Sequence, residues 1–143
     1  LVVLSSKKKM PFLSDPGHLK HKGFVLADMA EPYYELLYLP FEKTSPKPRF
    51  RAEVKSPKTS EQGFVLYYSH QCPFNVKYVP LIAEVAKAHG VPFKMVSFET
   101  TQQAQEAPAP FTTYSLFYNG EFVTSEILSE AKFAKIIADR TGK

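Results

Sequence analysis

The sequence predicts an α/β fold in two parts that are joined by a proline-rich segment. Short apolar runs typical of strands alternate with segments of helical spacing, in the order strand, helix, strand, strand and later strand, helix, strand, short helix, strand, strand, helix. Three prolines and six basic residues break any period between positions 43 and 62. We therefore predict units at 1–42 and 63–143 with a linker at 43–62, in which an edge strand at 49–54 is possible.

The first unit opens with an apolar run at 1–5 that is typical of a short buried strand. Asp15 and Pro16 then have the residue types of a helix N-cap and a first helical position, and Gly23 is a good helix stop. Two further strands are expected at 24–28 and 33–41.

The second unit has clearer signals for its turns and helix ends. Asn119-Gly120 is a strong signal for a two-residue hairpin turn, and Gly90 is expected to close a long helix. The spacing predicts strands at 64–68, 93–98, 113–118 and 121–124, helices at 73–89 and 129–141, and a short helix or irregular segment at 101–106. The inner face of the long helix is predicted to carry Val76, Val79, Ile82, Ala83 and Ala86.

The net charge of +4 comes entirely from the linker, because the segments before and after it are balanced. A solvated linker explains this charge. The alternative is a contact with nucleic-acid phosphates, but Phe50 is the single aromatic residue among the basic ones, so stacking of bases has little support. We expect no nucleic-acid partner.

Cysteine usage and hydropathy bear on location. A single cysteine excludes an internal disulfide and gives no sign of an oxidising compartment. There is no apolar run of about eighteen residues, so neither a membrane span nor a membrane partner is expected. We expect a cytoplasmic protein. The chain begins without Met, inside an apolar run, and we expect it to be a fragment of a longer protein.

The single cysteine, Cys72, follows an apolar strand and opens a helix. The helix dipole and the free N–H groups at a helix start favour the thiolate, which is the nucleophilic form. Cys72 is therefore either a reactive or ligand-contacting thiol, or a small buried hydrophobe. Asn75 stands where a second cysteine would make a dithiol, and its amide could donate a hydrogen bond to a thiolate.

His70 lies two residues before the cysteine, and on extended chain such positions point the same way. It is either a general base for Cys72 or a solvated loop histidine. These two side chains are too few for a zinc site, which needs about four ligands. We predict no metal site.

Residues 63–143 resemble the thioredoxin and glutaredoxin superfamily. Cys72-Pro73-Phe74-Asn75 matches the glutaredoxin pattern Cys-Pro-aromatic-Cys, with Asn75 in place of the resolving cysteine. Pro80 stands where thioredoxins have a helix-kinking proline, and Pro110 precedes a strand as the superfamily's cis-proline does. The resemblance implies a thioredoxin-like fold with Cys72 as candidate catalytic thiol and a substrate groove lined by His70, Pro73, Asn75 and Pro110. A trans turn proline is the alternative for Pro110.

Residues 1–42 resemble the last third of GNAT-family N-acetyltransferases, which end with a strand, a short helix that closes in a Gly-Phe pair, and two strands. Here the pair is Gly23-Phe24. Leu19 falls about where that family often has the tyrosine that protonates the leaving thiolate, and the glycine-rich acetyl-CoA pyrophosphate loop is absent from the 143 residues. No catalytic residue is carried over to this unit. Acetyl-CoA is implied for the parent protein only.

Together the two units resemble YoaP-like proteins, in which a thioredoxin-like tail follows an acetyltransferase domain. The resemblance is most specific at 10–16, 34–40 and 107–120. It implies a GNAT-type, acyl-CoA-dependent N-acetyltransferase whose accessory domain binds or docks a small-molecule or peptide substrate. A monothiol redox module acting through Cys72 and a structural or interaction domain are the alternatives.

Overall fold

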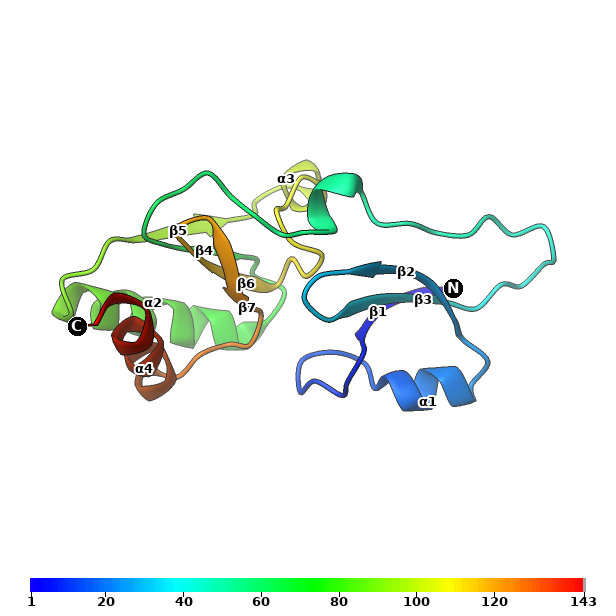
Figure 1. Cartoon of the computed structure of the whole chain (residues 1–143), viewed down its shortest axis with the longest axis horizontal. Helices are drawn as coiled ribbons and strands as arrows, with labels where there is room; N and C mark the ends of the chain where they lie inside the picture. The colour runs from blue at the N-terminus through cyan, green and yellow to red at the C-terminus, as the bar shows by residue number, and fades with distance from the viewer. Residues whose placement is uncertain (143) are drawn as a thin grey trace. The chain divides into compact units, whose positions relative to one another are not determined.

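The computed structural model describes residues 1–142, which form two compact units, each with its own sheet (Figure 1). The first unit contains residues 1–57 and 108–110, and the second contains residues 58–107 and those from 111 onward. The mixed α/β class that the sequence predicts is confirmed.

The first unit is a three-stranded antiparallel sheet with one short helix. Its elements are β1 (Val2–Ser6), α1 (Pro16–His21), β2 (Val25–Ala30) and β3 (Tyr34–Tyr38), and the strand order is β1-β3-β2. The Asp15 carboxylate caps α1 as predicted, because it accepts hydrogen bonds from the backbone N–H of Gly17 at 2.8 Å and of His18 at 3.2 Å. Gly23, with φ of +92°, then turns the chain into β2.

The segment from 49 to 57 is part of this unit and is not a free linker. The Asp28 carboxylate accepts hydrogen bonds from the Phe50 backbone N–H and from Lys55 Nζ, each at 2.9 Å. The backbone N–H of Glu31 donates to the Lys55 carbonyl at 2.7 Å. The edge strand that was possible at 49–54 is not formed. A 3-10 turn, η1 (Ala52–Val54), takes its place and buries Val54.

The second unit is a mixed sheet with two helices on one face (Figure 1). Its elements are β4 (Phe64–Tyr68), α2 (Pro73–Ala88), β5 (Phe93–Ser97), α3 (Thr101–Gln105), β6 (Tyr114–Tyr118), β7 (Glu121–Thr124) and α4 (Glu130–Thr141). The strand order is β5-β4-β6-β7, in which β5 runs parallel to β4 while β6 and β7 are antiparallel to their neighbours.

The core of the second unit lies between this sheet and its helices. The Phe133 ring of α4 contacts Phe64 at 5.3 Å and Phe93 at 5.6 Å between ring centroids. The inward prediction for α2 is confirmed for Val79, which is 2% exposed, but it is wrong for Val76, which is 67% exposed. Val76 lies in the first turn of the helix, and helical spacing alone cannot show that this turn adds no side chain to the buried cluster.

The predicted hairpin is present between β6 and β7. Asn119 has φ of +47° and Gly120 has φ of +84°, and two positive φ values are what a type I′ turn requires. The Asn119 side chain accepts a hydrogen bond from the Gly63 backbone N–H at 2.8 Å, and the Thr59 N–H donates to the Gly120 carbonyl at 3.0 Å. The hairpin is therefore tied to the residues that lead into β4.

Candidate functional site

Cys72 lies at the turn between β4 and α2, where the sequence places it. It is the N-cap residue of α2, with extended backbone angles (φ −102°, ψ 120°), and Pro73 follows at the start of the helix. The thiol is free and half-buried, and it makes no capping hydrogen bond. An accessible thiol beside the N–H groups of a helix start is suited to hold a ligand or to act as a nucleophile.

The Asn75 side chain holds the Cys72 turn in place through hydrogen bonds to the backbone. Its side-chain N–H groups donate to two backbone carbonyls, Ser69 O and Thr113 O, each at 2.8 Å, and the residue is 1% exposed. Both amide hydrogens are therefore used, so the expected hydrogen bond from Asn75 to the Cys72 thiolate is not available. Asn75 instead links the loop after β4 to the segment that enters β6, and so fixes the base of the turn.

Two buried oxygen atoms at the base of the turn lack a hydrogen-bond partner among residues 1–142. They are Asn75 Oδ1 and Ser69 Oγ. The amide cannot be turned over to satisfy Oδ1, because the opposite orientation would point that oxygen at the carbonyls of Ser69 and Thr113.

His70 is turned toward the end of β5. Its Nε2 lies 3.2 Å from Ser97 Oγ, and its ring packs edge-on against Tyr68 with 5.6 Å between centroids. Ser97 donates its one hydroxyl hydrogen to Glu99 Oε1 at 2.6 Å, so His70 Nε2 must be the donor toward Ser97. No hydrogen bond joins His70 to Cys72 in the part of the chain that the structure describes. Its role as a base for that thiol stays a prediction.

Exposed apolar side chains surround the first turn of α2. Phe74 is 62% exposed, and beside it lies a hollow of about 220 Å³. The hollow is lined by Phe74, Tyr78, Ile127, Ser129 and Lys132. None of these residues is predicted from the sequence as part of a site. The aromatic position of the Cys-Pro-aromatic pattern was the one available signal, and Ile127 is distant in sequence.

Pro110 belongs with its two preceding residues to the first unit, so the Cys72 turn is described without it. The cis peptide bond among the described residues is Glu31–Pro32, and Ala109–Pro110 is trans. The cis isomer that the thioredoxin resemblance implies for Pro110 is therefore wrong for this structure, and the trans turn proline holds.

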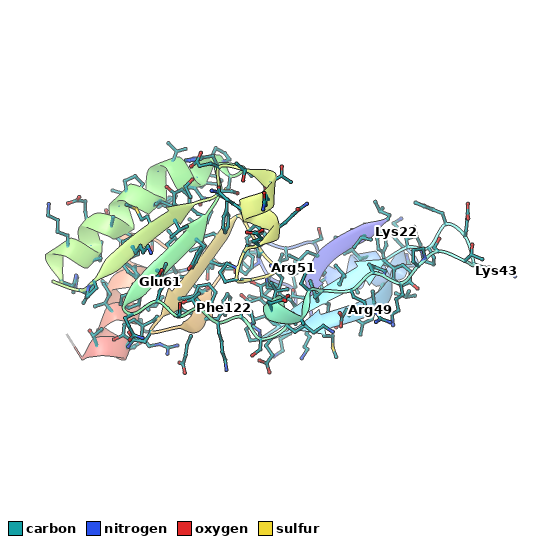
Figure 2. The ribbon with its side chains drawn as sticks, turned by 90° about the horizontal axis from the view of Figure 1, so that it is seen from above. Lys22, Lys43, Arg49, Arg51, Glu61 and Phe122 are labelled. Carbon is teal, nitrogen blue, oxygen red and sulfur yellow. The ribbon has the colours of Figure 1, made fainter. Side chains whose placement is uncertain are left out.

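The first unit has its own buried charge. Glu35 in β3 is mostly buried and pairs with Lys20 Nζ of α1 at 2.9 Å, which ties the helix to the sheet. Lys22, Lys43 and Arg49 are among the exposed basic residues of this unit. Figure 2 shows Lys43 and Arg49 on the segment that follows β3.

Within residues 1–142, no three His, Cys, Asp or Glu side chains gather as a metal ion would require. None of the helices in that range has the length and apolarity needed to cross a membrane.

The fold and the turn define a mixed α/β protein with two separate sheets and a half-buried cysteine at a strand-to-helix turn. Residues 92–135 match the family model described as YoaP-like. The chain is also 39% identical over 137 residues to a Bacillus subtilis (strain 168) protein named Uncharacterized N-acetyltransferase YoaP. This alignment covers 96% of the chain and 55% of that protein, so the chain spans about half the length of the curated relative it matches. No solved structure matches the chain. The expected similarity to YoaP is confirmed by these two matches, and the thioredoxin-like assignment of the second unit stays a prediction.

Proposed function

We propose that this chain is a region of a GNAT-type, acyl-CoA-dependent N-acetyltransferase, and that its second unit is a thioredoxin-like accessory domain which binds or docks the substrate. The observation that carries the proposal is the 39% identity, over 96% of the chain, to a protein named as an N-acetyltransferase. Acetyl-CoA would be the acyl donor, and a small molecule or peptide with an amine would be the acceptor.

The element order of the first unit supports its part in the proposal. A strand, a short helix that ends at Gly23-Phe24 and two further strands follow one another as in the GNAT resemblance. The unit supplies sheet and packing to an acetyltransferase fold. Its Lys20–Glu35 pair and the Asp28 carboxylate make contacts within the unit, and neither is assigned a role in transfer.

The element order of the second unit supports a thioredoxin-like domain. A cysteine follows the first strand and opens the first long helix, and a hairpin and a final helix close the unit. On this proposal Cys72, Pro73 and His70 face the ligand, Phe74 adds apolar contact area, and Asn75 fixes the turn beneath them. Pro110 is proposed for the same groove on the resemblance alone.

The test uses the complete reading frame that encodes this chain. The purified protein is mixed with acetyl-CoA and a panel of amines, and release of CoA thiol is followed with a thiol reagent. We expect amine-dependent release of CoA and an acetylated product by mass spectrometry. A protein that neither binds acetyl-CoA by calorimetry nor releases CoA with any amine would overturn the proposal.

The docking role has its own test. Phe74→Asp should raise KM for the acceptor about tenfold and leave kcat within about twofold, because it removes binding contacts that lie outside the reacting atoms. Phe41→Asp is the matched control, since Phe41 is also an exposed phenylalanine (77%, against 62% for Phe74) and belongs to the first unit. Equal effects of the two variants would contradict a docking role for the Cys72 turn.

The free, half-buried thiol favours one second candidate, a monothiol redox module. The Cys72 thiolate would attack one sulfur of glutathione disulfide, form a mixed disulfide and release glutathione thiolate, which takes up a proton. Whole-protein mass spectrometry after mixing with glutathione disulfide measures this step. A rate within about tenfold of that of a short unstructured cysteine peptide would rule the redox candidate out.

A further inference from the structure

A groove of about 410 Å³ lies between β7 and α4 in the second unit, apart from the Cys72 turn. One stripe of α4 forms its wall, and the stripe residues are Lys132, Lys135, Ile136, Asp139 and Arg140. These positions are three or four apart, so they share one face of the helix. The floor is aliphatic, because Val123 of β7 and Leu128 of the connecting loop meet Ile136 there.

Two ion pairs involve the charged residues of this α4 face. Lys132 pairs with Glu126 at the start of α4, and Arg140 Nη1 lies 3.5 Å from Glu121 Oε2 at the start of β7. Lys132 and Arg140 are eight residues apart, which is about 12 Å along a helix. The groove is called the slot below, and its volume is near the lower end of the range for small-molecule sites.

The two charges in the middle of the slot have no ion-pair partner among the described residues. They are Lys135 and Asp139, which are both exposed and lie four positions apart on α4. Side chains at this spacing are neighbours, with about 5–6 Å between their Cβ atoms. The slot therefore presents one cation and one anion side by side above an aliphatic floor, neither of them in an ion pair with another residue of the range 1–142.

We propose that this slot binds a free α-amino acid with an aliphatic side chain. The ligand carboxylate pairs with Lys135, the ligand ammonium pairs with Asp139, and the side chain packs on Val123, Leu128 and Ile136. Charge complementarity argues for this occupant, because a zwitterion satisfies both free charges at once, whereas a simple acid or a simple amine satisfies one.

An added strand is a poorer occupant of this region. The outer edge of β7 is already bridged at its first residue, where Glu121 pairs with Lys58. β7 runs only from Glu121 to Thr124, so little strand edge is left for a peptide to extend. The proposal goes beyond acetyl transfer and does not depend on it, since no slot residue is placed in the transfer chemistry.

The ligand side of the test uses the whole 143-residue chain labelled with ¹⁵N. Titration with L-leucine should shift the backbone amides of residues 123–139, with a Kd on the order of 1 mM. N-acetyl-L-leucine, L-leucinamide and glycine lack the ammonium, the carboxylate and the side chain in turn. Each should bind at least about tenfold more weakly.

The protein side uses neutral replacements of the two free charges. Lys135→Met and Asp139→Asn should each weaken L-leucine binding about tenfold, while Lys87→Met, an exposed lysine of α2 outside the slot, should leave it unchanged. Amide positions outside residues 123–139 report that each variant is folded. The proposal is overturned if L-leucine shifts no slot amides at 50-fold excess over 1 mM, or if the acetyl and amide analogues bind as tightly as L-leucine.

Discussion

At the scale of single residues, Asn75 is the side chain that most directly links sequence to site geometry. It occupies the position of a resolving cysteine in the glutaredoxin pattern, yet its chemistry here is structural. Two short hydrogen bonds to the carbonyls of Ser69 and Thr113 join two loops that are distant in sequence. A cysteine side chain at this position could not donate both bonds.

Asn75→Ala should destabilise the second unit by about 3 kcal/mol, because it removes two buried hydrogen bonds and leaves two carbonyls without partners. Urea unfolding followed by circular dichroism measures the change. Gln71→Ala is the control, since Gln71 is exposed in the same turn and should change stability by less than about 0.5 kcal/mol. Similar losses for both variants would argue that the turn is not held by Asn75.

At the scale of elements, glycines that share a positive φ differ in what surrounds them. A Cβ at Gly120 would lie 2.5 Å from the Thr59 carbonyl oxygen, which is backbone and cannot swing away. A Cβ at Gly90, which ends α2 with φ of +63°, would meet nothing within 4 Å. The hairpin glycine therefore has a packing requirement in addition to its conformational one.

Gly120→Ala should cost about 3 kcal/mol and Gly90→Ala about 1 kcal/mol, because both alanines enter the left-handed region but only the first also collides with backbone. Thermal and urea unfolding of the two variants side by side give the comparison. Equal losses would mean that the contact between Thr59 and the hairpin is not maintained in solution.

The segment from 49 to 57 shows how a charged side chain holds an element that has no regular structure. The register of β2 shifts between Leu26 and Asp28, and bulges of this kind re-aim side chains. Asp28 then bonds to Lys55 and to the Phe50 N–H. The hydrogen bond from Lys55, aided by the N–H groups of Met29 and Phe50, holds the pKa of Asp28 below its usual value despite the opposing effect of desolvation.

A carboxyl group with a lowered folded-state pKa stabilises the fold above its unfolded pKa of about 3.9, and this stabilisation is lost as pH falls through the folded pKa. Asp28→Asn should therefore cost about 1 kcal/mol at neutral pH, where the charge-assisted bonds are lost. The difference between wild type and variant should shrink as the pH falls below the unfolded pKa of about 3.9 and through the lower folded pKa. Urea unfolding at the two pH values checks this, and a difference that grows on acidification would contradict it.

At the scale of the whole molecule, the parts of the fold that the sequence predicts are those with local causes. Asp15, Asn119-Gly120 and the uninterrupted 64–68 run each contain the signal for their own structure, and the observed elements begin or end within about two residues of the expected positions. The segment at 49–57 was not predicted as part of the first unit, because its ties to Asp28 and Glu31 join positions more than twenty residues apart.

The site residues likewise divide into those with local causes, which the sequence predicts, and those whose roles depend on residues distant in sequence. Cys72 was placed correctly because strand, turn and helix signals surround it. The hydrogen bond by which Asn75 joins two loops depends on Thr113, 38 positions away, and the direction of the His70 ring depends on Ser97, 27 positions away. Charge patterning did not reveal the slot between β7 and α4 either, because its floor joins a strand, a loop and a helix that only the folded chain brings together.

Each unit has its own buried side chains, and a buried core is the source of cooperative unfolding. Leu37 in the first unit and Ile82 in the second are both fully buried, so each alanine replacement should cost about 3 kcal/mol. Leu37→Ala should raise amide hydrogen exchange in residues 1–57 and leave residues 58–107 close to wild type, and Ile82→Ala should do the reverse. Exchange measured by mass spectrometry on the whole chain decides the matter. If either variant lost protection equally in both segments, the two units would unfold as one. The docking role of the second unit would then be tested by surface variants such as Phe74→Asp alone.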